Sequence, residues 1–340
     1  MSLPIVWFVL WGVLWAVYFM LDGFDLGLGM LYGFLGRNEA EKAALRRTIG
    51  PVWDGNEVWL LTAGGATFAA FPAAYASLFS FLYSALLLIL FGLILRGAAL
   101  EFRAKSAGAG WAKAWDRAFG AASFLPAFLF GVAFGNLFRG LPLDASGYHG
   151  TLLGLLNPYG ILTGAFFVAL FAVHGGLWVT LKTTGELRVR ARRMAGELWG
   201  YPLILAAGFL VASYFSTGLA ANYLKSPLWA AVPAAAVAAL LATRLFIGRT
   251  RDFAAFLASG ATILLVTATG LVGLFPNLIP SRTDPASSLT IFNSSSSPYT
   301  LKIMTVVALV FVPIVIVYQI WVYRVFRHRI DATEDGGESY

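Results

Sequence analysis

Nine long apolar runs constrain the fold of this chain more than any other feature of its sequence. Each run could cross a bilayer, because ~20 helical residues at ~1.5 Å each span the ~30 Å hydrocarbon layer. Of the 340 residues, 59% are hydrophobic and only 12% are charged. We therefore expect an all-α polytopic membrane protein with nine transmembrane helices, at residues 3–35, 49–71, 74–95, 115–138, 156–181, 198–219, 228–246, 253–274 and 301–326.

The basic residues lie between these runs and predict the topology. All but four of the 24 Lys and Arg residues lie at the junctions or loops where an odd-numbered run ends, and the exceptions are Arg139, Lys225, Arg282 and Lys302. The positive-inside rule then puts the N-terminus outside and the C-terminus in the cytoplasm. Eight spans would break this alternation. Because the basic residues are spread over short loops, including one that holds Arg96 and Arg103, we expect no nucleic-acid partner.

Two pairs of acids interrupt the first two runs. Asp22 and Asp25 are three residues apart, as are Asp54 and Glu57, so each pair shares one helix face. An acid costs roughly 2.5 kcal/mol or more near the centre of a membrane helix. We therefore expect all four carboxyl groups to face inward, at similar depth, in the cytoplasmic part of the bundle.

These acids allow two interpretations. Four carboxyl groups in a low dielectric cannot all be ionised cheaply, so some should be protonated near neutral pH, as a proton conduit requires. Alternatively, the same groups bond to Asn56, helix ends or basic loops and are purely structural. The sequence leaves both interpretations open.

Other residues limit the chemistry of the chain. There is no cysteine, which excludes disulfides and thiolate-bound iron–sulfur clusters. His174 is the only histidine in an apolar run, and without a partner motif we expect it to be a packing residue rather than a haem ligand. We predict no catalytic, cofactor-binding or metal-binding residue on this chain.

Small residues, a helix-start signal and one polar loop give further expectations about the fold. Glycines in the first two runs are expected to let helices approach closely, and they include Gly27, Gly29, Gly33, Gly64 and Gly65. Asn157 and Pro158 are typical of a helix start. The outer loop at 275–300 either caps a neighbouring subunit or is solvated.

Several motifs together resemble subunit II of the cytochrome bd quinol oxidases. They cover most of the chain: Asp22-Gly23-Phe24-Asp25-Leu26-Gly27, Pro51-Val52-Trp53-Asp54-Gly55-Asn56-Glu57-Val58-Trp59-Leu60, Thr62-Ala63-Gly64-Gly65-Ala66, Phe68-Ala69-Ala70, Phe134-Gly135-Asn136, Leu156-Asn157-Pro158, Thr184-Gly185-Glu186-Leu187, the loop from Phe275-Pro276 to Ser281, and Ser288-Leu289-Thr290.

The resemblance implies a haem-free subunit of a respiratory-chain enzyme in the bacterial inner membrane. The partner, subunit I, would carry b-type and d-type haems, oxidise quinol and reduce oxygen to water. The family fold is two four-helix bundles plus one peripheral helix. That fold implies bundles at 1–138 and 139–275, an outer loop at 276–300, a peripheral span at 301–328 and a disordered cytoplasmic tail at 329–340.

The resemblance also implies roles for particular residues. The residue that matches Asp54 is implicated in proton uptake from the cytoplasm, so we predict a proton pathway through Asp54, Glu57, Asp25 and Asp22. Some relatives have a histidine where Val52 stands, and some have glutamine at the position of Glu57. Some family members hold a quinone as a structural lipid in subunit II, or carry a small single-span accessory subunit.

Two other functions remain as alternatives. The buried acids could serve an ion-coupled membrane transporter, or the chain could be a pure assembly scaffold. The choice between ubiquinol and menaquinol is not encoded here, because that pocket would lie on the partner.

Overall fold

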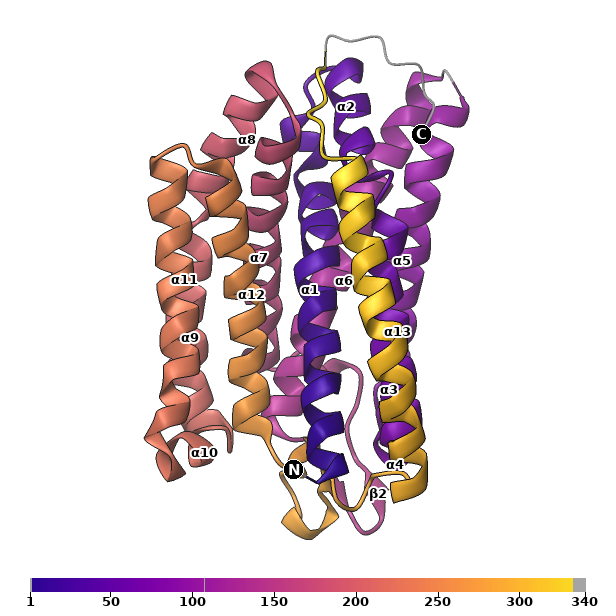
Figure 1. Ribbon diagram of the computed structural model, residues 1–340, viewed down its shortest axis with the longest axis vertical. Helices are drawn as coiled ribbons and strands as arrows, with labels where there is room; N and C mark the ends of the chain where they lie inside the picture. The colour runs from indigo at the N-terminus through magenta and orange to yellow at the C-terminus, as the bar shows by residue number, and fades with distance from the viewer. Residues whose placement is uncertain (1, 107, 333–340) are drawn as a thin grey trace.

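The computed structural model describes residues 2–106 and 108–332, and they form a bundle of long helices (Figure 1). The α-helices are α1 (Leu3–Leu35), α2 (Glu39–Ile49), α3 (Trp53–Ala70), α4 (Pro72–Phe81), α5 (Tyr83–Phe102), α6 (Ala109–Arg139), α7 (Pro158–Lys182), α8 (Gly185–Leu198), α9 (Gly200–Ser216), α10 (Ala220–Lys225), α11 (Ala231–Gly248), α12 (Asp252–Leu274) and α13 (Pro298–Val325). Two short antiparallel pairs join β1 (Leu143–Asp144) to β2 (Gly147–Tyr148) and β3 (Asn277–Ile279) to β4 (Leu289–Thr290).

Eight described helical segments are long and apolar enough to cross a membrane, so the all-α membrane class is confirmed. The second predicted run is not among the eight. It forms α3, an 18-residue helix that packs on α1 but carries Asp54, Asn56 and Glu57 in its first two turns. The count of nine spans therefore stays a prediction.

The two ends of the bundle differ. One end, here called the α2 end, holds α2, α8 and the last turn of α13 (Figure 1). The opposite end, here called the β2 end, holds the start of α1 together with α10 and β2. The basic residues of α2 and α8 are thus gathered at one end, as the alternation of basic loops predicts.

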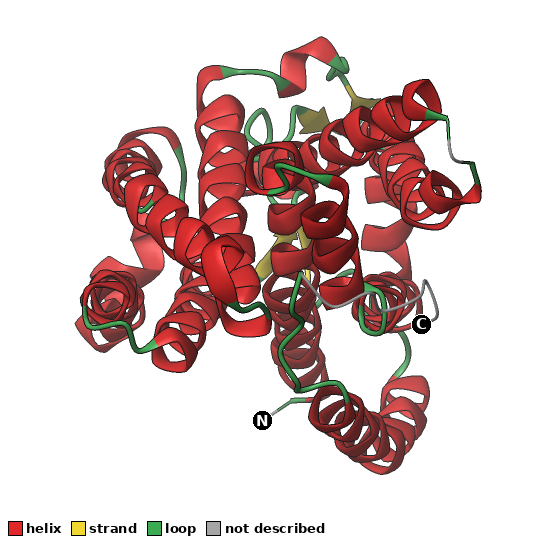
Figure 2. Ribbon diagram, turned by 90° about the horizontal axis from the view of Figure 1, so that it is seen from above, coloured by secondary structure: helices red, strands yellow, loops and turns green. Residues whose placement is uncertain are grey.

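α1 is central to the packing, and glycine permits its closest approach to another helix. It contacts α3, α6, α7 and α12. The view from above shows the long helices packed side by side, many of them seen nearly end-on (Figure 2). A Cβ atom on Gly27 would lie 1.8 Å from the carbonyl oxygen of Phe171 on α7, and one on Gly175 would lie 2.3 Å from the backbone nitrogen of Leu28. Any larger residue at Gly27 or Gly175 would separate the two backbones.

The other predicted packing glycines differ in whether they pack within this chain. Gly29 contacts Ser123 on α6, as expected. Around Gly33, Gly64 and Gly65, however, a Cβ atom would meet no atom within 4 Å. The part of α3 that carries Gly64 and Gly65 is therefore open within this chain, although Ala63 and Ala70 on the same helix are buried.

The third predicted run is divided and extended. α4 ends at Phe81, and α5 begins at Tyr83 and continues to Phe102 rather than stopping at residue 95. Arg96 consequently lies inside a helix, so our assignment of it to a loop is wrong. The helix continues because Arg96 finds buried carboxylate partners, described below.

Two polar segments fold back on the chain. In the outer loop, the Ser296 backbone nitrogen donates to Ala70 O over 2.9 Å, and the Leu141 nitrogen donates to Pro280 O over 2.9 Å. This loop therefore covers the β2 end of its own chain. In the predicted tail, Ile330 bonds to the backbone of Lys182, while residues 333–340 lie outside the described part of the chain.

Candidate functional site

Arg96 is the centre of a buried ion-pair network between α1, α3 and α5. Its side chain is 1% exposed. Its Nη2 atom donates to Asp22 Oδ1 over 2.6 Å and to Glu57 Oε1 over 2.5 Å. Tyr18 Oη donates to the other oxygen of Asp22, Oδ2, over 2.9 Å. Two carboxylates from different helices thus share one guanidinium inside the bundle.

Asp25 belongs to a second hydrogen-bonded group beside the first. Asn56 Nδ2 donates to Asp25 Oδ2 over 2.7 Å, and Asn56 Oδ1 accepts from Tyr323 Oη over 2.8 Å and from Gln319 Nε2 over 3.2 Å. Trp59 Nε1 donates to Gln319 Oε1 over 2.6 Å. Asn56 therefore joins α1 to α13.

Asp54 does not lie with the other three acids. It is exposed, whereas Asp22 and Asp25 are fully buried and Glu57 is 23% exposed. Asn56 faces α1 and α13, and Asp54 lies roughly 200° around the helix from it. The expectation that all four acids face inward is therefore wrong for Asp54.

Glu57 lies between the exposed position of Asp54 and the buried positions of Asp22 and Asp25. On α3, Asp54 and Glu57 are separated by roughly 60° around the helix axis. Glu57 thus lies at the edge of an exposed face that carries Asp54, Leu61, Gly65 and Phe68, while its carboxylate reaches inward to Arg96.

His174 is buried with both ring nitrogens engaged. Nε2 lies 3.0 Å from Met20 O and therefore donates to it, which leaves Nδ1 to accept from Ser259 Oγ over 3.1 Å. The ring stacks on Phe256 with centroids 4.5 Å apart. The side chain forms a helix–helix contact between α1, α7 and α12.

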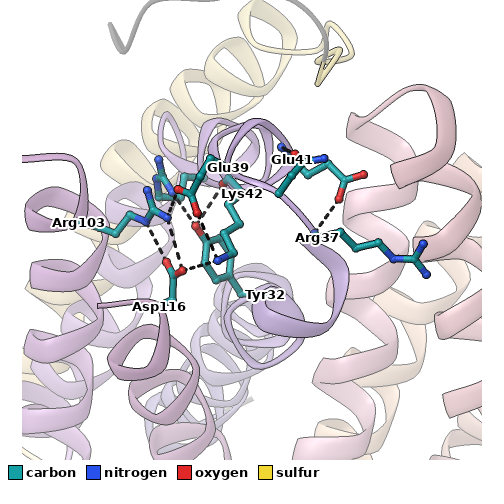
Figure 3. Close-up of polar contacts among 9 residues, drawn as sticks. Tyr32, Arg37, Glu39, Glu41, Lys42, Arg103 and Asp116 are labelled. Atoms are coloured by element: carbon teal, nitrogen blue, oxygen red, sulfur yellow. Dashed lines mark hydrogen bonds and ion pairs between the residues drawn. The ribbon is translucent and has the colours of Figure 1, made fainter. Parts of the chain in front are cut away.

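Salt bridges outside the apolar core fix α2 to its neighbours (Figure 3). Asp116 on α6 accepts from Lys42 over 2.7 Å and from Arg103 over 2.9 Å. Arg103 also bonds to Glu39, and this hydrogen bond lowers the pKa of Glu39 below its ordinary value. Glu41 pairs with Arg190 over 2.6 Å, which links α2 to α8. These contacts fix the position of α2 and therefore of the start of α3, which follows it in the chain.

Several residues of the network were not identified from the sequence. Arg96, Tyr18, Gln319 and Tyr323 were missed. Arg96 could have been suspected, because Leu-Ile-Leu precedes it and Gly-Ala-Ala-Leu follows it, which is an apolar setting on both sides. Among the described residues, no group of three or more His, Cys, Asp or Glu side chains could hold a metal ion.

The fold and this network define a class: an integral membrane protein of packed helices with a buried, multi-acid ion-pair network near one end. A family model described as cytochrome bd terminal oxidase subunit II matches residues 3–326. The chain therefore belongs to the cytochrome bd terminal oxidase subunit II family.

Individual relatives and a solved structure agree with this assignment. The cytochrome bd ubiquinol oxidase subunit 2 of Bacillus subtilis is 39% identical over 334 residues, 98% of each chain. The cytochrome bd-I ubiquinol oxidase subunit 2 of Escherichia coli K12 is 36% identical over 360 residues, 96% of this chain and 95% of the relative. The bd oxidase of Geobacillus thermodenitrificans has a chain of similar fold, with a TM-score of 0.80 at 17% identity, covering 96% of this chain and 99% of that chain.

Proposed function

We propose that this chain is a haem-free subunit II of a quinol:oxygen oxidoreductase and that it helps to deliver cytoplasmic protons to a haem-bearing subunit I. The named relatives support the proposal that this chain is part of such a complex, since they are subunits of ubiquinol oxidases. Subunit I would carry the b-type and d-type haems, oxidise quinol and reduce oxygen to water. A bound quinone and an accessory subunit remain predictions.

The position of Glu57 carries the proton-delivery part of the proposal. Oxygen reduction to water consumes protons, and a proton path needs exchangeable groups from an exposed position to the interior. Asp54 is such an exposed acid, Glu57 lies three residues further along α3, and Arg96 joins Glu57 to the buried Asp22. The four acids that the sequence singles out thus span the distance from surface to core.

Unpartnered polar atoms support a hydrated path. Arg96 Nε, Arg96 Nη1 and Asp25 Oδ1 have no hydrogen-bond partner among the described residues. Buried polar groups are nearly always hydrogen-bonded, and buried water commonly supplies the missing bonds. We infer that water completes the path between Arg96 and Asp25.

The exposed face of α3 supports contact with a second membrane subunit. Leu61 is 73% exposed and Phe68 is 61% exposed, and the open glycine Gly65 lies on the same face. Membrane helices associate most closely where small residues let their backbones approach. Subunit I packed on this face would bring Asp54 to the subunit boundary, where a proton could pass between chains.

The isolated chain is expected to bind no haem. Both nitrogens of His174 are already hydrogen-bonded within the protein, so ligation would require breaking at least one of those bonds. The check is the visible spectrum of the chain expressed without its partner. A Soret band that disappears in His174→Ala would refute this expectation, and the co-purified complex provides the positive control.

The predicted topology puts the α2 end in the cytoplasm. A cytoplasmic reporter fused after Tyr340 is expected to be active, and an export-dependent reporter at the same position is expected to be inactive. A matched pair of fusions after Gly147, at the opposite end, should give the reverse result. Activity of the export-dependent reporter after Tyr340 would overturn the orientation and the cytoplasmic source of protons with it.

A further inference from the structure

Two adjoining hollows lie beside α13. The first, of about 490 Å³, lies at the α2 end between α1, α7, α12 and the segment after α13. The second, of about 1040 Å³, is an apolar cleft that runs between α1, α3 and α13. They share the lining residues Met20, Leu21, Phe253, Leu257, Tyr323 and Arg327, so one continuous ligand could occupy both.

The cleft exists because α13 is fixed to the bundle near its two ends. Near its start, Trp7 Nε1 donates to Leu301 O over 3.2 Å and to Thr305 Oγ1 over 3.0 Å. Near its end, Gln319 and Tyr323 bond to Asn56. Between Leu301 and Gln319 the helix rises roughly 27 Å, comparable to the hydrocarbon layer.

The side chains that α13 presents to this cleft are apolar over most of that length. They include Ile303, Met304, Val307, Ala308, Phe311 and Val312. This stretch of α13 offers no polar side chain to orient a water-soluble ligand, and it fits hydrocarbon chains; the polar lining residues of α13, Gln319, Tyr323 and Arg324, lie towards its last turns.

The hollow at the α2 end is strongly basic. Its lining contains Arg47, Lys182, Arg327 and Arg329, and no Asp or Glu is among the described residues that line it. The nearby acid Asp331 accepts a hydrogen bond from Thr184 through its carboxylate, over 2.8 Å. Asp331 carries a single carboxylate, so the four cations of the hollow outnumber it, and an anion would balance the remainder.

Two buried donors in this hollow have no acceptor. Trp178 is 4% exposed, and its indole Nε1 has no partner among the described residues. Arg47 Nε is likewise buried without one. An unpartnered buried donor destabilises the fold, so this arrangement favours a ligand rich in acceptor oxygens. Phosphate oxygens are strong acceptors for arginine.

We propose that this site binds an anionic glycerophospholipid, with its phosphate among Arg47, Trp178 and Arg327 and its acyl chains in the cleft between α1, α3 and α13. The basic mouth lies at the α2 end, so the lipid belongs to the leaflet on that side. The lipid fills the space that would otherwise separate α13 from α1, and it thereby supports the contacts of Tyr323 and Gln319 with Asn56. This inference does not depend on the proposed proton path.

The test is lipid retention by the intact complex with its haem-bearing partner. The purified complex is delipidated, incubated with vesicles of phosphatidylglycerol or of phosphatidylcholine, washed in detergent and examined by native mass spectrometry. We expect one tightly retained phosphatidylglycerol per complex and at least ~10-fold less phosphatidylcholine. Equal retention of both lipids, or recovery of a quinone from the site in place of phospholipid, would overturn the proposal.

Two matched pairs of variants locate the lipid. The double variant Arg47→Gln and Arg327→Gln should reduce phosphatidylglycerol retention at least ~10-fold, whereas Arg193→Gln with Arg249→Gln removes the same charge from exposed positions and should not.

Ala308→Phe should displace the acyl chains, and its control is Leu309→Phe, at a 71% exposed position on the same helix. Haem content shows that each variant is assembled. Wild-type retention in either assembled test variant contradicts the proposal.

Discussion

Replacing Arg96 with glutamine is expected to prevent or severely weaken assembly of the complex. The substitution leaves Asp22 and Glu57 facing each other without their shared cation, and Asp22 is fully buried. Removing one partner of a buried ion pair typically costs about 3–5 kcal/mol, because the remaining charge is left uncompensated. The measurement is the amount of haem-containing complex recovered from membranes and the midpoint of its thermal unfolding.

Two controls distinguish loss of the Arg96 network from the general effect of removing a charge. Arg193→Gln removes a basic residue from a surface pair with Glu197, where both side chains are mostly exposed, and should leave the unfolding midpoint unchanged. Adding Asp22→Asn and Glu57→Gln to Arg96→Gln should restore part of the lost assembly, because it removes the uncompensated charges. A single Arg96→Gln variant that assembled with the parental unfolding midpoint would show that the network is not needed for stability.

Replacing Asp54 with asparagine is expected to slow oxygen reduction at least ~10-fold, which corresponds to ~1.4 kcal/mol in the barrier. Asparagine is nearly isosteric but cannot exchange a proton. Because Asp54 is exposed on α3 and makes no buried ion pair among the described contacts, assembly should survive. The measurement is quinol-driven oxygen consumption per haem, with Glu197→Gln as the control for loss of an exposed carboxyl group.

The outcome at Asp54 separates two functions. If the variant assembles with all its haems and consumes oxygen at the parental rate, the acids of this chain are structural and the chain is a scaffold for its partner. If turnover falls while haem content is kept, proton delivery through this chain is supported.

The overall architecture could be predicted from the sequence because it depends on local properties. Apolar runs of membrane length define most of the helices, and Asn157 starts α7 as expected, since its side chain accepts a hydrogen bond from the Gly160 nitrogen. Gly27 was correctly expected to allow close helix packing. The apolar runs and the Asn157 cap depend on neighbouring residues alone, and the small size of Gly27 permits close approach by whichever helix lies against it.

The candidate site could be predicted only in part because long-range contacts set the rotation of α3. Asn56 bonds to Tyr323, which is 267 positions away in the chain, and this contact turns Asn56 inward and Asp54 outward. The spacing of Asp54 and Glu57 gives their angle to each other but not the direction in which that face points. Arg96 was missed for a similar reason, since its buried partners lie on α1 and α3.

Proton uptake during a single turnover tests the central claim most directly. The complex is reconstituted in vesicles with a pH-sensitive dye on the side that holds the α2 end, and oxygen is added to the reduced enzyme. We predict that proton loss from that side slows at least ~10-fold in Asp54→Asn, in step with haem oxidation, and is unchanged in Glu197→Gln. Proton uptake at the parental rate in a fully assembled Asp54→Asn complex would contradict this account.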